Sequence, residues 1–145
     1  MVMTNAQWDY RFLQMAELIS TWSKDPSTRV GAVIVDNERR ISSLGYNGFP
    51  KHINDDERLD IRKIKYKMVV HAECNALLFA SMQPATDYTI YTYPFMPCPT
   101  CASMIIQSGI SRVVSYENEN ERWAEDFAIS REMFKEAGVD LCEYL

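Results

Sequence analysis

Two short blocks of the sequence hold residue types whose spacing could do chemistry: HAE, from His71, and PCPTC, from Pro97. Cys98 and Cys101 are three residues apart, so at the start of a helix they would share one face, where free N–H groups and the helix dipole favour thiolates. With the His71 imidazole they form three N and S ligands that suit zinc and leave one tetrahedral position open, as in catalytic zinc sites. Glu73 could then take a proton from the metal-bound water and deliver it to a ring nitrogen and a leaving amine.

Each block is a weak signal alone, but the pair is specific. The blocks lie 27 residues apart (98 minus 71) with a predicted strand between them, and they match the known signature of zinc-dependent nucleobase deaminases, His-x-Glu followed by Pro-Cys-x-x-Cys. Two other interpretations stay open. Cys98 and Cys101 could be a thiol–disulfide redox pair, which leaves His71 and Glu73 without a role. A purely structural zinc could instead take Cys74 as its fourth ligand.

Length and composition limit the classes of protein to which this chain could belong. The 145 residues, 47% hydrophobic and 24% charged, fit a single domain spanning 1–145. We expect a soluble cytoplasmic protein, because there is no secretory signal and no apolar run of about 18 residues that could span a membrane. In that compartment the four cysteines are expected to be reduced. The net charge of −5 argues against a general nucleic-acid surface.

The first half of the chain predicts a helix and a hairpin that precede the HAE block. Apolar residues recur at helical spacing from Trp8 to Trp22 and stop before Pro26. Residues 30–36 and 39–48 are predicted to be two strands of a hairpin. Residues 49–66 show no clear period and are expected to be a functional loop. Within and beside it, residues 57–67 carry five basic and two acidic side chains, which indicates either a solvated helix face or a patch that holds phosphate.

The second half alternates helices and strands, each predicted chemical block lying at a helix start. After a helix to about residue 82, the predicted elements are a strand at 87–93, a helix at 101–108, a strand from 111, a helix to 138 and a final strand from 139. This alternation favours parallel strands with helices covering both faces, and the hairpin supplies the antiparallel part. We therefore expect a three-layer α/β/α sandwich around a mixed five-stranded sheet.

Over nearly its whole length the chain resembles the deoxycytidylate deaminases of the cytidine and deoxycytidylate deaminase superfamily. The resemblance rests on SKDPSTRVGAVIVD, GYNGFP, ERLD, KYKMVVHAECNALL, PCPTCA and IIQSGI. SKDPST and GYNGFP distinguish it from transfer-RNA adenosine deaminases, riboflavin-pathway deaminases and free cytidine deaminases, which share the zinc blocks. It implies the hydrolysis of dCMP to dUMP and ammonia, which supplies thymidylate synthesis.

The resemblance also implies roles for individual residues. It assigns one zinc ion per subunit to His71, Cys98 and Cys101, and proton transfer to Glu73. Substrate contacts fall on Asn47 at the sugar, Ala72 beside the base, and Ser23 and Lys24 at the phosphate. Alternatives remain for two of these: Asn47 could simply form the turn beside Gly48, and Lys24 could be a solvated side chain.

Regulation is a further implication of the resemblance. Such enzymes are typically homohexamers, activated by dCTP and inhibited by dTTP, with the effector and its Mg²⁺ bound near GYNG at a subunit contact. A triphosphate needs concentrated positive charge. The candidate residues for the effector are Tyr46, Asn47, Gly48, Arg58, Arg62, Lys63 and Lys65.

Two departures from the family and two alternative functions remain. The stretch YTYPFMPCPTC carries about one extra residue before Pro97, and Cys74, Cys142 and His52 do not make a convincing second, structural zinc site.

A deaminase of a base within nucleic acid, or of another small cytosine or purine substrate, is the alternative enzyme. Against a nucleic-acid substrate, the chain lacks a stripe of aromatic and basic residues on which a strand could stack. A non-catalytic module with a structural zinc is the alternative of a different class, and Glu73 argues against it.

Overall fold

Local signals in the sequence begin and end the elements that carry the site. Thr4 and Gln7 form a capping box at the start of the first helix, and Pro99 occupies the first turn of the helix that follows Cys98. Gly109 and Gly138 end the last two helices with left-handed φ angles of 97° and 76°, a conformation that glycine adopts without steric cost.

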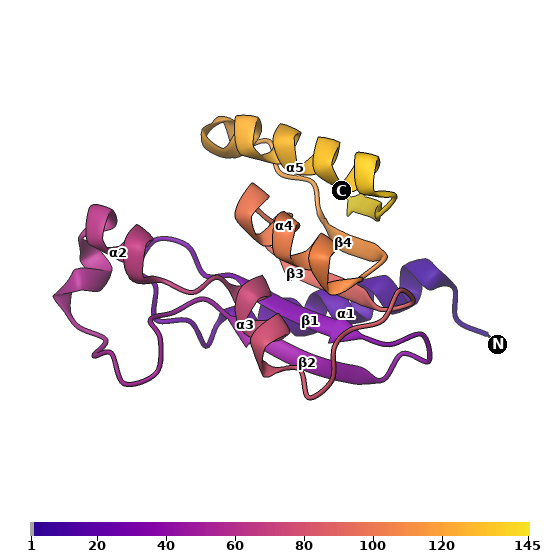
Figure 1. Ribbon diagram of the computed structural model, residues 1–145, viewed down its shortest axis with the longest axis horizontal. Coiled ribbons are helices and arrows are strands. Elements are labelled where there is room, and N and C mark those ends of the chain that lie inside the picture. The colour runs from indigo at the N-terminus through magenta and orange to yellow at the C-terminus, as the bar shows by residue number, and fades with distance from the viewer. Residues whose placement is uncertain (1) are drawn as a thin grey trace.

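The structure is a computed structural model that describes residues 2–145 (Figure 1). Its elements in chain order are α1 (Asn5–Ser20), β1 (Gly31–Val35), β2 (Ile41–Tyr46), η1 (Glu57–Asp60), α2 (Arg62–Met68), α3 (Ala72–Phe79), β3 (Thr89–Tyr93), α4 (Pro99–Ser108), β4 (Arg112–Tyr116), η2 (Glu121–Trp123), α5 (Ala124–Ala137) and β5 (Asp140–Tyr144). None of the helices in residues 2–145 combines the length and the hydropathy that crossing a membrane requires.

The five strands form one mixed sheet in the order β2-β1-β3-β4-β5. Strand β1 pairs antiparallel with both β2 and β3, whereas β3, β4 and β5 run parallel to one another. The mixed five-stranded sheet predicted from the sequence is therefore confirmed, including the antiparallel hairpin of β1 and β2.

Helices cover both faces of the sheet and explain why β1 is buried along its whole length. Ala32 and Ile34 of β1 belong to the core beneath α3, α4 and α5. Val33 and Val35 alternate to the other face and pack with residues of α1. The helices of the second half thus all lie on one face, and α1 alone covers the other. The two parallel crossovers follow the same strand direction, and with the same handedness they place α4 and α5 on the same side.

The segment after the hairpin differs from the expected loop. Residues 57–60 form the short helix η1 and residues 62–68 form α2, which extends away from the sheet in Figure 1. Helix α2 spans only seven residues, too few for a repeated apolar pattern. Its one buried side chain is Lys65, whose amine lies 3.1 Å from an oxygen of Asp25, so an ion pair and not an apolar face attaches the helix.

A buried carboxylate joins α1 to three strands. Asp9 is 1% exposed and accepts two hydrogen bonds from Arg112 on β4, at 2.8 and 2.6 Å. The hydroxyls of Tyr91 on β3 and Tyr144 on β5 donate to it at 2.8 and 2.7 Å. Burial alone would raise the pKa of Asp9, but the hydrogen bonds from Arg112, Tyr144 and Tyr91 hold it below its usual value.

Strand β2 and helix α3 approach each other so closely that only a glycine fits between them. A Cβ atom at Gly45 would lie 2.3 Å from the carbonyl oxygen of Ala72 and 2.5 Å from the amide nitrogen of Ala76. Both neighbours are backbone atoms of α3, so neither can move without moving the helix. The start of α3, and with it His71 and Glu73, is therefore fixed by contact with β2.

Replacing Gly45 with Ala should lower the free energy of unfolding by about 3 kcal/mol, at the upper end of the cost of overpacking, because α3 must be displaced from β2. Urea denaturation monitored by circular dichroism measures this. Gly48→Ala is the matched control, since a Cβ atom at Gly48 has no neighbour within 4 Å, and it should change stability by less than about 0.5 kcal/mol. Equal losses in the two variants would contradict the close-contact explanation.

Candidate active site

The two chemical blocks meet at the N-termini of two neighbouring helices. His71 is the residue that caps α3, and Cys98 is the residue that caps α4. Cys101 lies in the first turn of α4, and Glu73 lies in the first turn of α3. The positive ends of both helix dipoles therefore face one point, which favours anionic groups there.

Three potential metal ligands converge at this point. Nδ1 of His71 lies 3.4 Å from Sγ of Cys98 and 3.3 Å from Sγ of Cys101, and the ligand atoms of the three residues all lie within 4.8 Å of one another. Tetrahedral N and S ligands around zinc, with bonds of about 2.0–2.3 Å, lie about 3.5–3.8 Å apart. The donor types and their separations therefore fit a zinc ion.

The pKa values of Cys98 and His71 are shifted in opposite directions within the cluster. Hydrogen bonds from Cys101 and His71 lower the pKa of the Cys98 thiol, which favours a thiolate in the cluster at neutral pH. The hydrogen bond with Cys98 in turn raises the pKa of His71 to about 9, against the effect of burial. A divalent cation that binds here replaces the protons on His71 and Cys101, and metal affinity should consequently increase with pH.

Glu73 lies beside the cluster in a very different environment. Its side chain is buried, with 4% of the residue exposed, and burial raises the pKa of the carboxyl above its usual value. No ion pair of residues 2–145 includes it. A carboxyl group whose pKa is shifted toward neutrality can both accept and return a proton.

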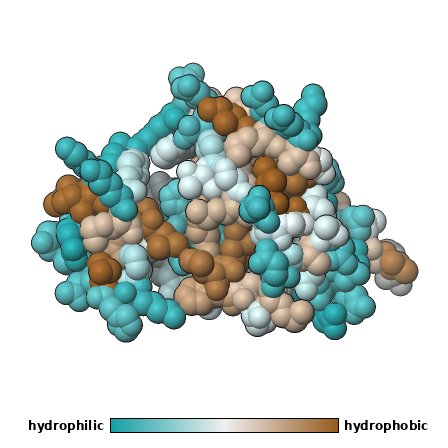
Figure 2. All heavy atoms as spheres, in the orientation of Figure 1, coloured by the Kyte–Doolittle hydropathy of each residue, from teal (hydrophilic) through white to brown (hydrophobic). Residues whose placement is uncertain are grey.

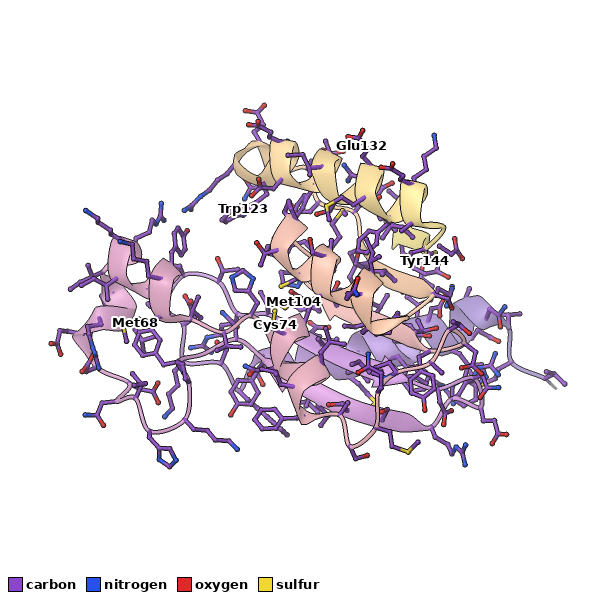
Figure 3. The ribbon with its side chains drawn as sticks, viewed as in Figure 1. Met68, Cys74, Met104, Trp123, Glu132 and Tyr144 are labelled. Carbon is purple, nitrogen blue, oxygen red and sulfur yellow. The ribbon has the colours of Figure 1, made fainter. Side chains whose placement is uncertain are left out.

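Cys74 lies behind the cluster and outside it. Its Sγ is 3.4 Å from Sγ of Cys101 and 3.2 Å from Sδ of Met104. Figure 3 shows Cys74 and Met104 together where α3 and α4 meet. However, the group of potential metal ligands consists of His71, Cys98 and Cys101 and does not include Cys74. This placement weakens the interpretation in which Cys74 completes a closed structural site.

A cavity of about 120 Å³ opens beside the cluster. The residues that line it include His71, Ala72, Glu73 and Cys98. Its apolar walls come mainly from Val30, Val69, Phe95, Met96, Trp123 and Phe127, and its polar side chains away from the cluster are Asp25, Ser27, Thr28, Asn47, Lys65, Tyr66, Arg122 and Asp126.

Asn47 lines this cavity, but both ends of its amide are occupied by backbone groups. Its oxygen accepts a hydrogen bond from the Val30 N–H at 2.9 Å, and its nitrogen donates to the Thr28 carbonyl at 2.9 Å. The side chain therefore holds the loop before β1 in place. Contact between Asn47 and the substrate sugar stays a prediction, as does contact between the base and Ala72, which is fully buried and lines the cavity.

The two residues predicted to bind phosphate lie elsewhere. The Ser23 hydroxyl is buried and donates to the carbonyl oxygen of Asn47 at 2.8 Å. The Lys24 side chain is 71% exposed and pairs with Asp55 at 3.0 Å. Neither residue is among those that line the cavity, so their roles stay predictions that this placement does not support.

The residues predicted to bind an effector fall into different environments. Tyr46 is exposed, and Gly48 pairs with Val70 through two backbone hydrogen bonds. Arg58 pairs with Asp56 at 2.8 Å. The other candidates divide further: Arg62 and Lys63 are exposed on α2, whereas Lys65 is buried and lines the cavity beside the metal cluster.

Several cavity residues have no counterpart among the sequence-based candidates. They are Tyr66 on α2, Phe95 before the Cys98 block, Arg122 and Trp123 in η2, and Phe127 on α5. The pair Arg122-Trp123 follows the polar run ENENE. A basic residue beside a large aromatic one in an otherwise polar loop is the signal that could have indicated them.

Comparison with known proteins finds a matching family model and several similar sequences. The model of the family described as "Cytidine and deoxycytidylate deaminase zinc-binding region" matches residues 6–117. An uncharacterized deaminase from the luxG 3′ region of Aliivibrio fischeri is 47% identical over 94% of this chain and 92% of that protein. The deoxycytidylate deaminase of Mus musculus is 37% identical over 92% of this chain and 77% of that protein, and the one of Homo sapiens is 34% identical over 96% and 80%.

Solved structures show the same fold. The dCMP deaminase of the cyanophage S-TIM5 in apo form superposes with a TM-score of 0.74 and 23% identity, covering 97% of this chain and 99% of that one. Its complex with dCMP and dUMP gives a TM-score of 0.72 and 24% identity, covering 98% and 99%. The predicted α/β architecture is confirmed by this likeness.

Replacing Cys74 with Ala should leave one zinc ion per chain, because the other three ligands do not depend on it. Metal analysis of the purified protein, by emission spectrometry after dialysis, measures this. Cys101→Ala should lose the metal, and Cys142→Ala serves as a cysteine control away from the cluster. Loss of zinc from the Cys74 variant as well as from the Cys101 variant, with zinc retained by Cys142→Ala, would instead support the structural zinc site.

Proposed function

We propose that this chain, which belongs to the cytidine and deoxycytidylate deaminase family, hydrolyses dCMP to dUMP and ammonia and so supplies dUMP for thymidylate synthesis. The observation that carries the proposal is a buried carboxylate, Glu73, beside a His71-Cys98-Cys101 cluster and a cavity. Relatives covering most of the chain at 34–37% identity are named deoxycytidylate deaminases, which favours dCMP over other cytosine compounds.

His71, Cys98 and Cys101 would hold the zinc ion, one per subunit, through one nitrogen and two sulfur atoms. When bound, zinc supplies a Lewis acid that makes a water molecule acidic enough to attack as a nucleophile near neutral pH. Cys98 is the thiolate that prepares the cluster for a cation, because its pKa is lowered. The rest of the reaction depends on proton transfers that the protein must provide.

Glu73 is the group that moves those protons. Its carboxylate accepts one proton of the attacking water and transfers it to N3 of the cytosine ring. It then takes the remaining proton from the hydroxyl group added at C4 and delivers it to the amino group, which leaves as ammonia as the C4 carbonyl forms. Burial raises its pKa, so the protonated form is less unfavourable than for a solvated glutamate. Both transfers are therefore closer to balance at neutral pH.

Aromatic and small residues shape the place for the base. Phe95, Trp123 and Phe127 line the cavity, and the rings of Phe95 and Phe127 pack together with centroids 5.4 Å apart. Such walls offer a flat base stacking and apolar contact. Ala72 presents only a methyl group at the start of α3, which lets a base come close to the catalytic carboxylate.

Glu73→Gln should reduce the turnover number for dCMP by about 10³-fold, within the range of general acid–base catalysis, while fold and zinc content stay unchanged. The loss of cytosine absorbance measures turnover, with dCMP, CMP and deoxycytidine compared as substrates. Glu132→Gln, an exposed position on α5 (Figure 3), is the matched control. An active Glu73 variant, or a wild-type protein that consumes none of the three substrates, would refute the proposed function.

We further propose that the protein forms a homo-oligomer, a hexamer by family resemblance, in the cytoplasm. Support comes from large apolar side chains that α3 and α4 expose: Leu78 at 73%, Phe79 at 57% and Met104 at 46%. Figure 2 shows hydrophobic atoms gathered over the middle of this face of the molecule. Exposed apolar surface of this kind is typical of protein–protein contacts, and the four free cysteines suit a reducing compartment.

Regulation by dCTP with Mg²⁺ and by dTTP is proposed for the segment that includes Tyr46, Gly48 and α2. Arg62 and Lys63 support it as exposed cations. We expect dCTP to lower, and dTTP to raise, the dCMP concentration that gives half-maximal velocity. Arg62→Ala with Lys63→Ala should abolish both responses and leave the maximal velocity unchanged. Velocity curves that neither nucleotide shifts would exclude this regulation.

A further inference from the structure

The cavity that contains the catalytic cluster also contains two basic side chains away from it. Lys65 comes from α2 and Arg122 from η2. We propose that Arg122, supported by Tyr66 and Lys65, binds the 5′-phosphate of the substrate and selects nucleotides over nucleosides. This assignment rests on the proposed deaminase function and names the specificity-determining cation of the same site.

Lys65 contributes to the shape of this part of the cavity and adds little net positive charge to it. Its side chain is 5% exposed, and its amine lies 3.1 Å from an oxygen of Asp25 and 3.4 Å from the Ser27 hydroxyl. Asp25 also accepts hydrogen bonds from the backbone N–H groups of Ser27 and Thr28, at 2.8 and 3.1 Å. The charge of Lys65 is thus balanced by Asp25, and the pair holds α2 against the loop before β1.

Arg122 is a cation whose charge no carboxylate balances at close range. Its guanidinium donates a 2.7 Å hydrogen bond to the Tyr66 hydroxyl and lies 4.8 Å from the centroid of the Trp123 ring. Among the ion pairs of residues 2–145 none includes Arg122, although Asp126 also lines the cavity. The two rings hold the guanidinium at the wall, and its remaining N–H groups can meet an anion.

The chemistry of this arrangement suits a phosphate group. A guanidinium offers a planar set of donors that matches phosphate oxygens in pairs. Two further hydroxyl groups, on Ser27 and Thr28, line the same cavity. In a chain with a net charge of −5, a nucleotide also needs a local positive group to overcome general repulsion. Arg122 is exposed, which suits a phosphate that stays partly hydrated while the base reaches the buried cluster.

The competing assignment is Lys24, which the sequence favoured. Its amine pairs with Asp55, its side chain is 71% exposed, and it does not line the cavity. If Arg122 binds the phosphate, Arg122→Ala should weaken nucleotide binding and Lys24→Ala should not. If Lys24 binds it, the opposite result is expected.

The experiment measures dCMP kinetics and, by calorimetry, the binding of dUMP and deoxyuridine to zinc-loaded protein. Arg122→Ala should raise the KM for dCMP and the Kd for dUMP about 10- to 100-fold, the size of one or two charge-assisted hydrogen bonds. The Kd for deoxyuridine should stay within about twofold of wild type, because the nucleoside has no phosphate. Arg122→Lys should recover part of the loss, and Tyr66→Phe should raise the KM by a smaller factor.

Arg11→Ala is the matched control, because Arg11 is likewise exposed and lies 5.1 Å from the centroid of Trp8, on the helix that covers the opposite face. It should change neither constant. Equal weakening of dUMP and deoxyuridine by Arg122→Ala, or loss of dUMP selectivity in Lys24→Ala while Arg122→Ala binds normally, would overturn the proposal. A wild-type protein that binds dUMP but does not deaminate dCMP would count against the catalytic function and not against this phosphate site.

Discussion

The whole site depends on one contact, in which the backbone of α3 lies directly against β2. At Gly45 there is no room for a methyl group between the strand and the backbone of Ala72. Because Ala72 follows His71, this contact sets where the imidazole begins its reach toward Cys98. The second half of the cluster comes from α4, which follows β3 on the same face of the sheet. Three ligand atoms can therefore meet only if both helices hold their positions on that sheet.

Three buried carboxylates show how one chemical group serves different purposes in this fold. Asp9 is surrounded by Arg112 and two tyrosine hydroxyls, whose hydrogen bonds hold its pKa below the usual value despite burial. Asp25 receives Lys65 and backbone N–H groups, so it anchors a loop. Glu73 forms no ion pair among residues 2–145, and burial raises its pKa although Cys101 and His71 act in the opposite direction. The carboxylate whose pKa is raised is the one that the proposed chemistry requires to change its protonation state.

The sequence allowed prediction wherever the determining interactions are local. The spacing of residues 71–73 and 98–101 within a single helical turn predicts their chemistry. Runs of β-branched residues predict the strands. The position of Lys65 could not be predicted, because its burial depends on Asp25, forty residues away. The same limit applies to Arg122, which reaches the cavity only because η2 folds over toward Tyr66 on α2. Asn47 shows a third case, since its identity suggested a sugar contact while its amide is occupied by backbone groups from a different loop.

The network around Asp9 has a consequence for the way the chain is made. Arg112 lies 103 residues, and Tyr144 lies 135 residues, after Asp9 in the sequence. During synthesis from the N-terminus, α1 leaves the ribosome long before either partner exists, and an unpaired carboxylate is costly to bury. The full set of partners that Asp9 has in the folded protein is therefore available only after β4 and β5 have been translated. Asp9 thus couples the completed docking of α1, which covers one face of the sheet, to translation of the fifth strand.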